Sequence, residues 1–132
     1  MLVAGGSGVV PLMAMIRHRA ALGSDVPTRL LYSSRSYEEI IYRQEELERL
    51  AARDGSLEVI NTLTRSKPQG WRGYDRRIDA EMLEEVAWPP GESPLAFVCG
   101  PTPLVEGVAE ALVDLGHDPA RVKTERFGAT GG

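Results

Sequence analysis

Apolar segments of strand length alternate with segments of helical periodicity along the whole chain, and this order constrains the fold more than any other feature. The apolar segments predict five strands, at residues 2–4, 28–34, 57–63, 95–99 and 122–127. Helical spacing predicts helices at residues 10–22, 36–53, 79–86 and 102–115. Regular alternation of strands and helices is typical of parallel sheets with right-handed crossovers. We therefore expect a single three-layer, doubly wound α/β domain over residues 1–132, with helices on both faces of a five-stranded parallel sheet.

A glycine-rich turn, Gly5-Gly6-Ser7-Gly8, joins the first predicted strand to the first predicted helix. Glycine permits positive φ angles and a close approach of the backbone to a ligand. A helix N-terminus after such a turn favours an anion, above all a pyrophosphate. The spacing is G-G-x-G and not the G-x-G-x-x-G of the common dinucleotide fingerprint. From the turn alone, a phosphate site and a merely tight connection both remain open.

Composition excludes several classes of function. With 132 residues, 42% of them hydrophobic, the chain has the size and make-up of one globular domain, and its net charge of −4 argues against a general nucleic-acid or anionic-membrane binder. No apolar run approaches the ~20 residues of a membrane span. His18 and His117 do not have metal-ligand spacing, so we expect no metal site. The single cysteine, Cys99, favours a reducing cytoplasm.

Ligands of doubly wound sheets bind at the carboxyl ends of the strands, so the residues that follow each strand are the candidate site. They include a glycine turn, several arginines, a tyrosine and a thiol: Gly5 to Gly8, Ser34, Arg35, Thr64, Arg65, Arg72, Tyr74, Cys99, Gly100 and Pro101. Arginine binds phosphate in a bidentate manner, so this set favours a nucleotide with several phosphates. No acidic residue directly follows the second strand, where one would favour NAD. For Arg65, Arg72, Arg76 and Arg77, a solvated loop is the alternative interpretation.

Cys99 ends the fourth predicted strand and has two interpretations. It is either a small apolar residue at the end of a buried strand, or a contact to the reacting ring of a cofactor.

Three motifs resemble those of the ferredoxin–NADP⁺ reductase superfamily. Residues 5–12 (G-G-S-G-V-V-P-L) resemble its G-[TG]-[GS]-[IV]-x-P-[FLM] segment, residues 42–47 (Y-R-Q-E-E-L) its Y-x-x-E-L helix, and residues 99–103 (C-G-P-T-P) its C-G-P-x-P motif. The resemblance covers the whole chain and implies the NAD(P)-binding half of such an enzyme. It also implies an FAD-binding β-barrel upstream, which we expect to be absent from this chain.

The resemblance assigns a role to each matching residue. Gly6, Ser7 and Gly8 would lie along the pyrophosphate and the nicotinamide ribose, and Cys99 beside the nicotinamide C4. The other implied contacts are Gly100 and Pro101 at the dinucleotide, Thr64-Arg65 and Arg72-x-Tyr74 at the 2′-phosphate and adenine, and Phe127 on the flavin ring. NADP(H) is therefore expected in preference to NAD(H).

The function implied is that of a cytoplasmic NAD(P)H-dependent flavin oxidoreductase. Hydride would pass to FAD held by a separate domain or subunit, and electrons would pass on to an iron–sulfur, haem or oxygenase partner. The alternatives are a non-catalytic nucleotide-binding module or partner subunit with the same fold, and a phosphate-recognising α/β domain that never meets a nicotinamide.

Overall fold

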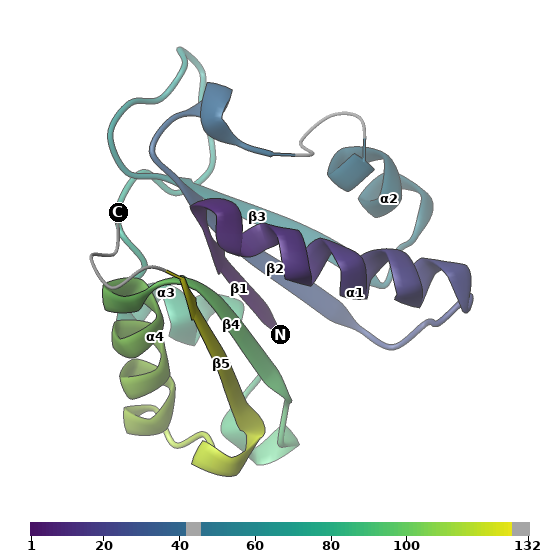
Figure 1. The fold of residues 1–132 in the computed structure, drawn as a ribbon, viewed down its shortest axis with the longest axis vertical. Helices are drawn as coiled ribbons and strands as arrows, with labels where there is room; N and C mark the ends of the chain where they lie inside the picture. Colours follow the sequence, from purple (N-terminus) through teal and green to yellow (C-terminus); the bar gives the residue numbers. More distant parts are fainter. Residues whose placement is uncertain (42–45, 128–132) are drawn as a thin grey trace.

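A five-stranded parallel sheet forms the centre of the computed structural model, which describes residues 1–41 and 46–127. The strands are β1 (Leu2–Gly5), β2 (Thr28–Ser34), β3 (Leu57–Leu63), β4 (Ala96–Pro101) and β5 (Val122–Phe127). Their order is β3-β2-β1-β4-β5, so the connections reverse direction between β1 and β4. The predicted doubly wound parallel sheet is confirmed (Figure 1).

Helices pack on both faces of this sheet (Figure 1). They are α1 (Val9–Ala21), α2 (Glu48–Arg53), α3 (Ala80–Val86) and α4 (Thr102–Asp114). Leu12, Met13 and Ile16 of α1 are buried on one face, and Val105 and Val108 of α4 are buried on the other. The central strands have continuous apolar sequences because helices cover both of their faces. Of the described segments, none forms a helix with the length and apolar character needed to cross a membrane.

The continuous helix predicted over residues 36–53 is wrong. The structure has a 3₁₀ turn at Tyr37–Glu39, then Ile40 in an extended conformation, and a regular α-helix only from Glu48. The Ile41 amide donates to the Tyr32 hydroxyl at 3.1 Å, and not to a carbonyl one helical turn back. Burial of the Ile40 side chain accompanies this bond, so tertiary packing overrides the helical pattern. Four residues of the Y-R-Q-E-E-L motif, 42–45, lie outside the described residues.

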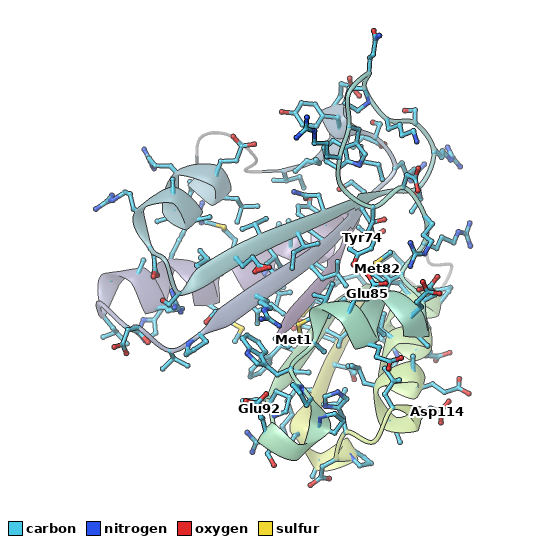
Figure 2. All side chains as sticks on the ribbon, turned by 180° about the vertical axis from the view of Figure 1, so that it is seen from behind. Met1, Tyr74, Met82, Glu85, Glu92 and Asp114 are labelled. Carbon is cyan, nitrogen blue, oxygen red and sulfur yellow. The ribbon has the colours of Figure 1, made fainter. Side chains whose placement is uncertain are left out.

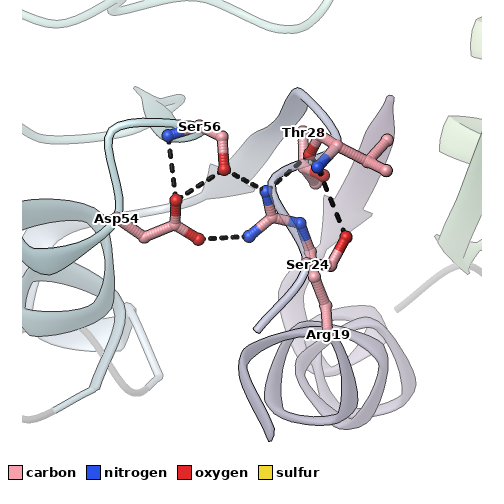
Figure 3. Close-up of polar contacts among 6 residues, drawn as sticks. Arg19, Ser24, Thr28, Asp54 and Ser56 are labelled. Atoms are coloured by element: carbon pink, nitrogen blue, oxygen red, sulfur yellow. Dashed lines mark hydrogen bonds and ion pairs between the residues drawn. The ribbon is translucent and has the colours of Figure 1, made fainter. Parts of the chain in front are cut away.

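The C-terminal half of α1 is tied to the turn before β3 by one arginine. The Arg19 guanidinium donates to the Asp54 carboxylate, to the Ser56 hydroxyl and to the Val26 carbonyl (Figure 3). Hydrogen bonds from Ser56, followed by those from Arg19, lower the pKa of Asp54 to about 2. This network fixes α1 against the amino ends of β2 and β3, at the edge of the sheet opposite the glycine turn.

Candidate functional site

A cleft of about 710 Å³ opens at the carboxyl edge of the sheet, where the strand order reverses between β1 and β4. Ligands of doubly wound sheets bind at this type of position. Its walls come from the ends of β1, β2, β3 and β4, from the start of α4 and from the segment before α3. The lining residues are Gly5, Gly6, Ser7, Ser33, Ser34, Arg35, Glu39, Ile41, Thr64, Arg77, Ile78, Pro101, Pro103, Leu104, Gly107 and Val108.

Glycines of two kinds shape the backbone at the edge of the cleft. A Cβ on Gly8 would lie 2.1 Å from the Cys99 carbonyl oxygen, and one on Gly100 would lie 3.1 Å from the Gly5 backbone. These glycines let the turn after β1 pack directly on the end of β4. Gly6 differs, because its φ is +52° and a Cβ there would meet no atom within 4 Å. Gly6 and Ser7 are exposed at the cleft, whereas Gly8 is buried.

A buried hydroxyl lies at the end of β2 in this cleft. Ser34 is 6% exposed, and its Oγ has no hydrogen-bond partner among the described residues. The neighbouring Thr64 hydroxyl donates to the Ser34 carbonyl at 3.5 Å, so it leaves the serine Oγ unpaired. Because buried polar groups are nearly always paired, an unpaired hydroxyl lining a cleft indicates a group that a ligand completes.

Charge in the cleft comes from two arginines and one glutamate. Arg35 and Arg77 form no ion pair with any described residue, although six other basic side chains do so. Glu39 lines the same cleft and accepts a hydrogen bond from the Ser36 hydroxyl at 3.2 Å. The cleft therefore offers two free cations and one carboxylate to a ligand.

Half of the predicted site residues line this cleft, but Arg72 and Tyr74 lie elsewhere. They line a separate hollow of about 410 Å³ along the outer edge of β3, together with Asn61 and Trp71. The Tyr74 hydroxyl donates to Glu85 of α3, and the two side chains point toward one another in Figure 2. This bond, followed by burial, raises the pKa of Tyr74.

The remaining predicted residues lie around the cleft without lining it. Arg65 is exposed and its amide donates to the Arg35 carbonyl at 2.9 Å. The Cys99 side chain is 5% exposed and packs with the α1-face core, and burial, then the charge of Glu125, raise its thiol pKa. Phe127 ends β5 opposite Pro101 and packs against the same core. Contacts of Cys99 with a nicotinamide and of Phe127 with a flavin stay predictions.

Sequence reasoning missed two charged residues and one helix of the site. Glu39 falls within the helix predicted over residues 36–53, and Arg77 has a solvated loop as its alternative. The first half of α4 supplies Leu104 and Gly107, whose positions depend on how the helix crosses the sheet edge. Gly107 in the middle of α4 is the available signal, because glycine destabilises a helix interior.

Comparison with known proteins identifies the domain. Residues 2–110 match the family model described as "Oxidoreductase NAD-binding domain". The chain belongs to this family. It is the nucleotide-binding domain of the ferredoxin–NADP⁺ reductase-like superfamily, as the motifs predicted.

Relatives of this NAD-binding domain include reductases from animals and bacteria. It is 36% identical over 118 residues to NADH-cytochrome b5 reductase 2 of Rattus norvegicus, covering 88% of this chain and 42% of the relative. It is 35% identical over 130 residues to the glycine betaine monooxygenase reductase subunit of Pseudomonas aeruginosa, covering 97% of this chain and 35% of the relative. The chain therefore spans less than half the length of these relatives.

Solved structures share the fold. The cytochrome b5 reductase domain of Ulva prolifera nitrate reductase superposes with a TM-score of 0.83 at 25% identity, covering 94% of this chain and 47% of that one. The flavohem-like FAD/NAD-binding domain of Vibrio cholerae nitric oxide dioxygenase also superposes with a TM-score of 0.83 at 25% identity. This superposition covers 96% of this chain and 50% of that one. In both cases the superposition covers about half of the solved chain.

Proposed function

We propose that this chain is the pyridine-nucleotide-binding half of an FAD-dependent oxidoreductase that passes hydride from NAD(P)H to flavin and then electrons to an acceptor. The observation that carries the proposal is the cleft at the reversal point of the sheet, with its exposed glycine turn and unpaired Ser34 hydroxyl. Membership of the NAD-binding family and the likeness to reductases support it.

The residues present fit a pyridine dinucleotide. Gly6 and Ser7 would hold the pyrophosphate, because the turn is exposed and Gly6 leaves open space beside its backbone. The Ser34 hydroxyl, which has no partner among the described residues, would form a hydrogen bond with the adenosine half of the ligand. At the other end, Pro101, which lines the cleft, and its neighbour Gly100 would flank the nicotinamide. The bound dinucleotide supplies a hydride, and the chain's own contribution is to orient the reacting ring and keep it in place.

FAD would come from a separate domain or subunit. Cys99 and Phe127, at the neighbouring ends of β4 and β5, are the residues of this chain that we place nearest the flavin. The acceptor would be an electron carrier, or a haem or oxygenase partner, since the relatives are named for cytochrome b5 and a monooxygenase. The free buried cysteine supports a cytoplasmic location.

NADP(H) is proposed in preference to NAD(H). Arg35 follows β2, where an arginine suits a 2′-phosphate, and Thr64-Arg65, which follows β3, adds a polar and a cationic group nearby. NADH is the second candidate, because Glu39 lines the cleft and a carboxylate accepts hydrogen bonds from ribose hydroxyls. The names of the cytochrome b5 reductase relatives also point to NADH.

Calorimetric titration of the 132-residue chain with NADP⁺ and NAD⁺ tests the proposal. Ser34→Ala is expected to weaken binding about two- to tenfold, the worth of one hydrogen bond, without lowering the stability of the free protein. Ser24→Ala, at the opposite edge of the sheet, is the control and should leave binding unchanged. Failure of the wild-type chain to bind either dinucleotide would contradict the proposed function.

A further inference from the structure

We propose that a hollow at the amino edge of the sheet binds a small amphipathic carboxylate, namely a medium-chain aliphatic acid. The hollow has a volume of about 500 Å³, within the range of about 300–1,000 Å³ that is usual for small-molecule sites. It lies beside the amino ends of β1, β2, β4 and β5, between the C-terminal half of α1 and the segment from Trp88 to Leu95. This is the edge opposite the nucleotide cleft, so the proposal goes beyond the proposed function and does not depend on it.

Exposed apolar side chains gather at this hollow. Met15 of α1, Val26 before β2 and Leu95 before β4 are 37%, 62% and 37% exposed, and all three line it. They are three of the seven large hydrophobic residues that are exposed in the described part of the chain. Methionine and aliphatic side chains make up much of the lining, and such adaptable walls suit an alkyl chain. Because clustered apolar exposure on a folded domain marks a binding surface, we assign the apolar part of a ligand to this wall.

The hollow also contains an unpaired hydrogen-bond donor. The Arg19 side chain is 11% exposed, and its two Nη atoms are taken up by the network with Asp54 and Ser56 (Figure 3). The third nitrogen of the guanidinium, Nε, is buried and has no hydrogen-bond partner among the described residues. Buried N–H groups are nearly always paired, so a ligand of this hollow is expected to carry an oxygen acceptor beside its apolar part.

A second guanidinium makes a carboxylate the fitting acceptor. Arg121, directly before β5, lines the hollow, and its Nε donates to the Ser93 carbonyl at 2.8 Å, which fixes the side chain. Arg121 forms no ion pair with any residue that the structure describes. Guanidinium groups bind carboxylate oxygens through charge-assisted hydrogen bonds. Glu92 is the one acidic residue of the lining and is exposed, so it opposes an anionic ligand and its removal provides a test of the opposite sign.

The test follows amide chemical shifts of the ¹⁵N-labelled 132-residue chain during titration with hexanoate, heptanoate, octanoate and the neutral octanamide. Octanoate and octanamide are also titrated into Arg121→Gln, Glu92→Gln and Arg49→Gln. Arg49 is an exposed residue of α2 that lines none of the hollows described above, so its variant reproduces the change in net charge. Urea unfolding of each variant checks the fold, and a separate titration with NADP⁺ reports on the nucleotide cleft.

We expect the acids to shift residues 15–19, 26–28 and 95–97, with affinity rising about three- to fourfold for each added methylene. Arg121→Gln should weaken octanoate about two- to fivefold and Glu92→Gln should strengthen it by a similar factor, whereas octanamide should not respond to either change. Arg49→Gln should behave as the wild-type chain. Shifts confined to the carboxyl edge, affinity independent of chain length, or an equal response of octanoate to Arg121→Gln and Arg49→Gln would overturn the proposal. None of these results alters the proposed nucleotide site, which the titration with NADP⁺ tests separately.

Discussion

Replacement of Gly8 by alanine is expected to destabilise the domain severely. The new Cβ would lie 2.1 Å from the Cys99 carbonyl oxygen, 2.5 Å from its carbonyl carbon and 2.7 Å from the Gly100 nitrogen. Non-bonded carbon atoms pack at about 3.5 Å, so the turn and the end of β4 would have to separate by more than about 1 Å. All three contacted atoms belong to the backbone, which places the cost near the upper end for overpacking, about 3 kcal/mol.

Urea unfolding followed by circular dichroism measures this cost, with Gly6→Ala as the matched variant. With an m-value of about 2 kcal/mol/M, Gly8→Ala should lower the urea midpoint by about 1.5 M. In Gly6→Ala the new Cβ would contact no atom within 4 Å, so the only cost is that of an alanine at a left-handed φ of +52°. This cost is expected to be about 1 kcal/mol, which corresponds to a midpoint shift of about 0.5 M. A Gly8→Ala midpoint equal to or above that of Gly6→Ala would refute the packing argument for the turn.

Three further predictions follow from the network at α1, the interior of α4 and the start of α3. The pKa of Asp54 is lowered from 3.8 to about 2 by Ser56 and Arg19, so its stabilising effect is present above pH ~4 and is lost as pH falls toward 2. Asp54→Asn should flatten this part of a stability-against-pH profile, and an unchanged profile would count against the network. Gly107→Ala should raise the free energy of unfolding by about 0.5–1 kcal/mol, because a Cβ meets no atom within 4 Å inside a helix; a lower urea midpoint would contradict this. Asp79→Ala, which removes the N-cap of α3, should cost about 1 kcal/mol by the same assay, and a loss below 0.3 kcal/mol would show that the cap is not stabilising.

The layout of the sheet could be predicted from the sequence because local and tertiary preferences agree there. The predicted ranges of β2 and β3 coincide with the observed ones, since each run is bounded by loop residues. β2 is buried from Leu30 to its end, and the edge strand β3 is buried at its two ends and half-buried over residues 59–61. The region after β2 could not be predicted. Its acidic residues and apolar spacing indicate a helix, but the buried Tyr32 hydroxyl and the burial of Ile40 stop the helix after one turn.

Of the candidate site, too, only a part could be predicted from the sequence. The glycine turn and Ser34 could be found because they directly follow strands, whose carboxyl ends meet at one edge. The spacing of Arg72 from Tyr74 places both residues in the predicted site, yet in the structure they line a separate hollow at the outer edge of β3. The side of β3 along which the loop returns is set by long-range bonds, from Leu63 and Thr62, which no local pattern encodes.

Mapping of amide chemical shifts on the ¹⁵N-labelled chain, titrated with NADP⁺, tests the central claim most directly. The account predicts that the largest shifts fall on Gly6, Ser7, Ser34, Arg35 and Arg77, at the carboxyl edge of the sheet. Shifts concentrated instead at residues 59–61 and 71–74, along the outer edge of β3, would contradict it, as would a spectrum that NADP⁺ does not change.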